Sequence, residues 1–135
     1  MDKKRKSAED GKSGTSRAEP RLHKRRKGDL TEKIERLELF EERLDVRLEG
    51  LSAFLDVDSN FLHVLGELHP RDGTELNTCV ELVVTAYEQD GRVAGTSSTS
   101  FDPENFFGFE AFNELVCLPL PNMDIIRIRV YPKKG

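Results

Sequence analysis

The chain has 135 residues and a mass of 15.4 kDa, which is enough for one domain. Its charge is divided at Gly28: residues 1–28 hold eleven Lys and Arg against four Asp and Glu, a net +7, whereas residues 29–135 carry −11 and all ten Phe and Tyr. No apolar run approaches the ~20 residues of a membrane span, and none follows the first cations as in a secretory signal, so we expect neither. We therefore expect an acidic folded part with a basic arm, in the cytoplasm (or nucleus, in a eukaryote).

The basic arm, residues 1–28, has Leu22 as its only large aliphatic residue after the first Met. So little apolar surface cannot offset the entropy of ordering the chain, which predicts disorder. Its cations gather in two blocks, Lys3-Lys4-Arg5-Lys6 and Lys24-Arg25-Arg26-Lys27. Such blocks suit import receptors or nucleic-acid phosphates, and the lack of aromatic residues predicts little sequence preference. The alternative is a solubilising arm that binds no nucleic acid.

Residues 30–55 show two competing periods. A heptad-like spacing joins Leu30, Ile34, Leu37, Glu41, Leu44, Leu48 and Leu51. Alternation of apolar with charged residues over 44–49 is instead typical of a half-buried strand. We expect a short amphipathic helix or linker over about 30–42, within residues 29–43, followed by a strand over about 44–49. The alternative is one continuous dimerising helix from 30 to 55.

The remainder of the chain reads as strands separated by turn residues. Alternation predicts strands over 61–68, 79–87, 92–100 and 125–131, and an aromatic, apolar segment covers 106–118. Asp90-Gly91 predicts a hairpin, and the Ser- and Thr-rich strand after it suits a sheet edge. The expected core comprises Val64, Leu82, Val84, Ile126, Ile128 and Val130. Short strands without helices between them predict an all-β, antiparallel, immunoglobulin-like β-sandwich over 44–135.

Several segments carry a resemblance to a known family. They are the strand 62–68, the strand 80–87 closing on Asp90-Gly91, the break at Phe101-Asp102-Pro103, the segment 107–112 and the terminal strand 126–131. In this order they resemble the FxLYD type of immunoglobulin-like domain over about 44–135. The resemblance implies an accessory or binding module with no catalytic group.

No residue pattern predicts catalysis, and we expect neither a cofactor nor a metal. Asp56, Asp58, Asn60 and Glu67 have the spacing of calcium ligands, but Phe61 stands where the loop needs Gly. His63 and His69 have no Cys or His partner at zinc spacing, and His63 is expected at the surface. Cys79 and Cys117 could pair across the sandwich, although reduced thiols are the default without export.

Binding is predicted at two places. Five Phe lie within residues 101–112, more than one strand face can bury, so one or two could form an exposed patch. Alternation places two cations and a phenol on the outer face of the last strand. The expected interface comprises Phe106, Phe107, Phe109, Arg127, Arg129 and Tyr131. We expect a non-enzymatic protein-interaction module, monomeric or weakly dimeric, whose arm localises it. The alternative is a nucleic-acid-associated protein that binds phosphates through the arm.

Overall fold

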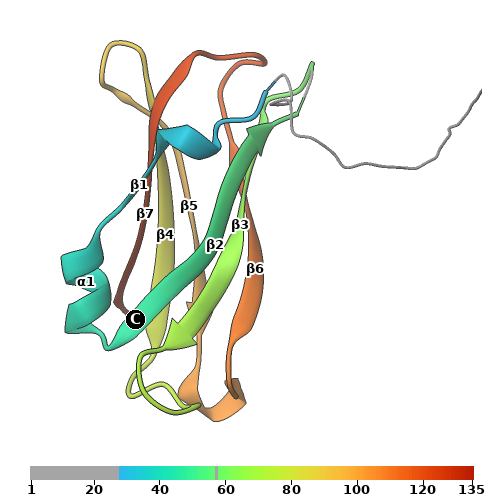
Figure 1. Cartoon of the computed structure of the whole chain (residues 1–135). Coiled ribbons are helices and arrows are strands. Elements are labelled where there is room, and N and C mark those ends of the chain that lie inside the picture. Colours follow the sequence, from blue (N-terminus) through green and yellow to red (C-terminus); the bar gives the residue numbers. More distant parts are fainter. Residues whose placement is uncertain (1–27, 57) are drawn as a thin grey trace, which may run out of the picture.

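The computed structural model describes residues 28–56 and 58–135 (Figure 1). Seven strands make up most of this part of the chain. In chain order the elements are a 3₁₀ turn at Thr31–Lys33, β1 (Ile34–Arg36), α1 (Glu38–Arg43), β2 (Val46–Leu55), β3 (Phe61–Pro70), β4 (Val80–Glu88), β5 (Val93–Phe101), a second 3₁₀ turn at Pro103–Asn105, β6 (Glu110–Cys117) and β7 (Ile125–Lys134).

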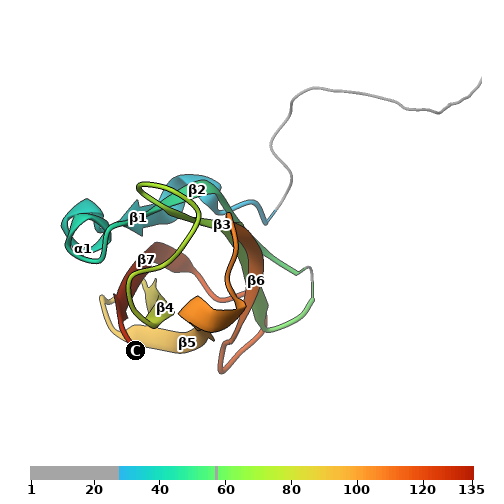
Figure 2. The ribbon, with the colours of Figure 1, turned by 90° about the horizontal axis from the view of Figure 1, so that it is seen from below.

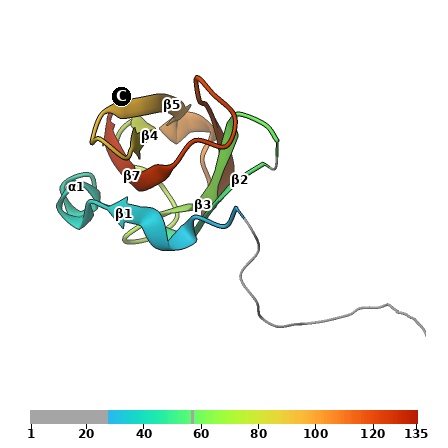
Figure 3. The same cartoon turned by 90° about the horizontal axis from the view of Figure 1, so that it is seen from above.

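The strands form two facing sheets. One has the order β1-β7-β4-β5 and the other the order β2-β3-β6. Seen along the strands, the sheets enclose one core, and α1 lies at the corner beside β1 (Figures 2 and 3). The predicted all-β sandwich is therefore confirmed. Neighbouring strands are antiparallel except β1 and β7, which pair in parallel.

The core is built from the predicted alternating faces. Leu62, Val64 and Leu68 of β3 are fully buried, as are Val80, Leu82 and Val84 of β4. The hairpin at 88–91 closes as expected, with Gly91 at φ +89°, and β5 lies at an edge of its sheet. Strand alternation alone was sufficient to assign these faces because β3 has no break in its register with β6, and β4 has none between Val80 and Ala86.

Register shifts account for two differences between the predicted and the observed strands. In β2 one extra residue lies between Glu49 and Ser52, where Gly50 takes φ +64°, so the strand continues to Leu55 rather than ending near 49. In β7 the pairing with β4 skips Ile126. Ile126, predicted in the core, is therefore 36% exposed, and Ile125 is buried in its place.

The segment 30–45 differs most from expectation. Only Glu38–Arg43 is helical, so the predicted helix over 30–42 is largely wrong and a continuous helix over 30–55 is wrong. Ile34–Arg36 instead form β1, which pairs with residues 128–130 of β7. Asp45 takes φ +61°, a left-handed conformation that ends the helix and turns the chain into β2.

An ion pair between the half-exposed Arg36 and a buried carboxylate joins β1, α1 and β2. Glu41 is 1% exposed and accepts hydrogen bonds from Arg36 at 3.0 and 2.7 Å. The backbone of Leu48, in the edge strand β2, donates to Glu41 at 3.1 Å and accepts from Arg36 at 2.6 Å. The Glu41 carboxylate raises the pKa of Arg36, which stays charged. The side chains of Arg36 and Glu41 thus make the two hydrogen bonds to the Leu48 backbone that a neighbouring strand would otherwise make.

The core assignment predicts unequal costs of truncation. Leu82→Ala and Ile128→Ala should each destabilise the protein by roughly 2–5 kcal/mol, because both side chains are fully buried. Ile126→Ala should cost about 1 kcal/mol or less, since its side chain already contacts solvent. Urea denaturation measures all three, and equal losses at Ile126 and Ile128 would contradict the register shift in β7.

The ion pair predicts a non-additive double variant. Arg36→Met should cost about 1–3 kcal/mol or more, because it leaves the Glu41 carboxylate buried without its cation. Arg36→Met combined with Glu41→Met should cost less than Arg36→Met alone, since no buried charge is then left unpaired. Urea denaturation of both, with Arg71→Met as an exposed control, measures this. A double variant as unstable as the sum of its singles would contradict it.

Candidate interaction surfaces

The two cation blocks of the basic arm lie outside the described residues. The predicted disorder of residues 1–28 and the proposed contacts of Lys3–Lys6 and Lys24–Lys27 therefore stay predictions. At the end of the arm, the carbonyl of Gly28 accepts a 2.8 Å hydrogen bond from the Leu55 amide. The arm is thus attached where β2 ends.

The aromatic segment divides into buried and exposed members. Phe101, Phe106 and Phe112 are in the core, so the prediction of Phe106 as an interface residue is wrong. Phe107 is 82% exposed and Phe109 52% exposed. Phe106 packs edge-on against Phe101, and so it faces inward although its neighbour Phe107 faces solvent.

Arg127, Arg129 and Tyr131, the predicted outward-facing residues of β7, lie on the outer face of the four-stranded sheet. We call this row the stripe. The guanidinium carbons of Arg127 and Arg129 lie over the Tyr87 ring, 5.0 and 5.3 Å from its centroid. Arg129 also forms a 3.1 Å ion pair with Glu35 of β1, which raises its pKa, while Arg127 has no carboxylate partner among the described residues. Tyr131 meets Phe40 of α1 edge-on, at 5.5 Å between ring centroids.

A groove of about 670 Å³ continues this stripe beyond Tyr131. Phe40, Leu44 and Pro132 supply its apolar part, and three cations and two polar side chains complete it: Arg43, Lys133, Lys134, Asn77 and Thr78. No carboxylate of the described residues lines it. We call the stripe and the groove together the β7–α1 surface, made of Phe40, Arg43, Tyr87, Arg127, Arg129, Tyr131, Lys133 and Lys134.

Unpaired cations are concentrated on the β7–α1 surface. Of the ten Lys and Arg between Gly28 and the last residue, six form ion pairs within the described part of the chain. The four that do not are Lys33, Arg43, Arg127 and Lys134, and three of these belong to the surface. This region is therefore electropositive on an otherwise acidic folded part.

The exposed Phe109 is not part of that surface. Phe109 stacks on His69 of β3, with ring centroids 5.0 Å apart and an interplanar angle of 8°. It therefore belongs with the three-stranded sheet, whereas Arg127 and Arg129 lie on the other one. The predicted interface included Phe109 together with the arginines, but the structure separates them, and the apolar neighbour of the stripe is Phe40 instead.

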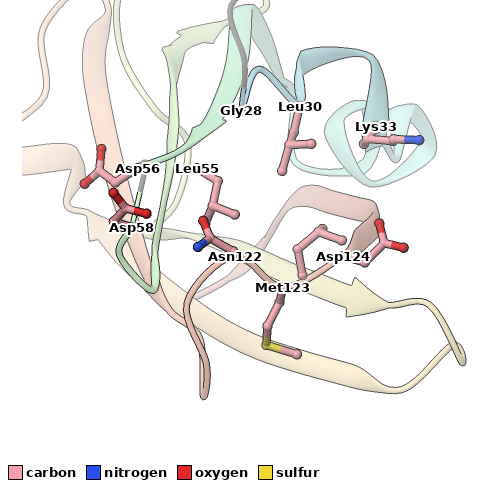
Figure 4. A pocket seen from close by; sticks show the side chains of 10 residues that line it. Gly28, Leu30, Lys33, Leu55, Asp56, Asp58, Asn122, Met123 and Asp124 are labelled. Atoms are coloured by element: carbon pink, nitrogen blue, oxygen red, sulfur yellow. The ribbon is translucent and has the colours of Figure 1, made fainter.

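A second pocket, of about 470 Å³, lies where the arm joins the fold (Figure 4). Its floor is apolar, and its rim carries Asp56, Asp58, Asp124 and one cation, Lys33. Asp56 accepts a 3.0 Å hydrogen bond from His63, which also stacks on Phe54, so His63 is half-buried rather than fully at the surface. The predominance of carboxylates disfavours an anionic ligand here.

The outer face of the three-stranded sheet holds a polar cluster. His69 Nε2 lies 2.9 Å from Glu67 Oε1 and 3.5 Å from Glu49 Oε1. Arg47 donates to the other Glu49 oxygen, Oε2, and this hydrogen bond lowers the pKa of Glu49. Sequence spacing missed the cluster because Glu49 comes from a different strand. The thiols of Cys79 and Cys117 are free.

Comparisons with known proteins show little likeness. No family model matches the chain, and no curated protein matches it. A solved structure from Bacteroides fragilis, provisionally named a beta-galactosidase, is similar to 67% of this chain at 17% identity and a TM-score of 0.34. The match spans 16% of that larger chain, and it carries no inference about activity. In the described residues, no helix has the length and apolarity to cross a membrane.

Proposed function

We propose that the folded part is a non-enzymatic protein-interaction module that binds an acidic segment of a partner protein on the β7–α1 surface. The basic arm then localises the module. The observation that carries this proposal is the gathering of unpaired cations there: Arg43, Arg127 and Lys134 have no carboxylate partner among the described residues. The resemblance to FxLYD-type domains, which stays a prediction, agrees with a binding role.

Charge supports an acidic protein segment over nucleic acid at this surface. Residues 29–135 carry −11, which repels a densely charged phosphate backbone approaching the module. A short acidic segment carries fewer charges and needs only the local cations. These extend from Arg127 along β7 to Lys133, so a segment in extended conformation could meet them in turn.

The aromatic groups give the surface more than charge. Stacking on Tyr87 holds the two guanidinium groups in place, so less side-chain entropy is lost when a carboxylate binds them. The groove beside Phe40 and Pro132 offers apolar surface for one side chain of the partner. Tyr and Arg are the residue types that most often dominate interface energies. We therefore expect the partner segment to combine carboxylates with an apolar residue.

The test uses a defined probe, a fluorescein-labelled twelve-residue Glu peptide with one central Phe. Binding is measured by fluorescence anisotropy on the full-length chain, with the eight cations of the two arm blocks replaced by Gln so that the arm does not capture the peptide. Arg43→Gln with Arg127→Gln should weaken binding by about 3- to 30-fold, because each exposed charge pair is worth up to about 1 kcal/mol.

Arg71→Gln with Arg92→Gln is the matched control. It removes the same charge from two arginines that already have carboxylate partners, and it should change affinity less than twofold. Replacing the Phe of the peptide by Ser should weaken binding to the parent chain. An equal loss in both double variants would contradict the proposal, because only overall charge would then matter.

The arm supports a second candidate function, nucleic-acid binding, through its net +7. A labelled DNA duplex should bind the natural chain with a steep salt dependence. Replacing Lys24–Lys27 by Gln should reduce the slope of log K against log salt by up to about 3.6, because each phosphate that a cation neutralises contributes roughly 0.9 to that slope. Duplex binding that depended on Arg43 and Arg127 instead would assign nucleic acid to the β7–α1 surface.

A further inference from the structure

The outer face of the three-stranded sheet, opposite to the β7–α1 surface, carries a group of side chains with no role in the proposed function. Glu67 and His69 project from β3, and Glu49 projects from β2. One ligand atom from each of the three lies within 4.8 Å of the other two. We propose that Glu49, Glu67 and His69 form a binding site for a divalent transition metal ion such as Zn²⁺.

The distances suit a tetrahedral ion. Ligand bonds of about 2.0–2.2 Å place neighbouring ligand atoms of such an ion about 3.4 Å apart. His69 Nε2 is 3.5 Å from Glu49 Oε1 and 2.9 Å from Glu67 Oε1, so an ion entering between them needs shifts of only a few tenths of an ångström. One imidazole with two carboxylates is a donor set that zinc accepts, and a water molecule would complete the coordination.

The sheet register also favours a cation at this place. Glu49 and Glu67 are direct cross-strand partners, and like charges directly opposite one another destabilise a strand pair. Arg47 contacts Glu49 through Oε2, which leaves Oε1 directed to His69. An ion between Oε1 of Glu49 and the Glu67 carboxylate would place a positive charge between these two like-charged partners.

The ligand groups are already oriented. The His69 ring stacks on Phe109, and its side chain is only 17% exposed. Arg47 holds Glu49 by a hydrogen bond, which is how neighbouring groups commonly orient carboxylate ligands of metals. Metal binding would therefore join β2 to β3 without rearranging either strand.

The experiment titrates ZnCl₂ into the full-length chain, freed of any histidine tag, by isothermal titration calorimetry. We expect one site per chain and a melting temperature that rises with Zn²⁺. His69→Ala should weaken binding at least tenfold. Glu67→Gln should do the same while leaving the His69–Phe109 stack in place, so the test does not depend on a single variant.

His63→Ala is the matched control. His63 lies on the same strand and stacks on an aromatic ring in the same way, but the structure pairs it with one carboxylate, Asp56, instead of two. Its loss should change zinc affinity less than twofold. Absence of saturable binding, equal loss in His63→Ala, or loss only when Cys79 and Cys117 are replaced by Ser would each overturn the proposal.

Discussion

The ion pair between Arg36 and the buried Glu41 carboxylate determines how the N-terminal segment joins the sandwich. Its two members come from β1, which belongs to the four-stranded sheet, and from α1, and both bond to Leu48 in the opposite sheet. The pair therefore holds the two sheets together at one edge. It also keeps α1 against β7, where Phe40 meets Tyr131. The groove beside α1 depends on this contact, although neither charged residue lines it.

The sequence predicted those parts of the fold in which local pattern and tertiary environment agree. The faces of β3 and β4 follow strict alternation, so Val64, Leu82 and Val84 could be assigned to the core. Alternation fails at Gly50 and Ile126, because an inserted residue puts the alternation before it out of step with the alternation after it. Glu41 occupied an apolar position of a heptad pattern, and only its burial beside Arg36 reveals why a charge is tolerated there.

The candidate sites were harder to predict because their members are distant in sequence. The outward parity of Arg127, Arg129 and Tyr131 was readable from β7 alone. Tyr87 lies far earlier in the chain than Arg127, and Phe40 reaches the stripe through a helix whose position no local pattern indicates. Glu49 meets Glu67 and His69 only through the register of β2 on β3. Such contacts depend on sheet order, which periodicity does not encode.

The arm joins the fold at one end of β2, and the groove beside α1 lies near the other end. Gly28 is bonded to Leu55, the last residue of β2, whereas α1 and its groove lie near Val46, the first. Ten strand residues at about 3.3 Å each put roughly 30 Å between them. The point where the arm joins the fold and the groove beside α1 therefore lie at opposite ends of β2. The domain could act as a rigid spacer, with its length set by a single strand.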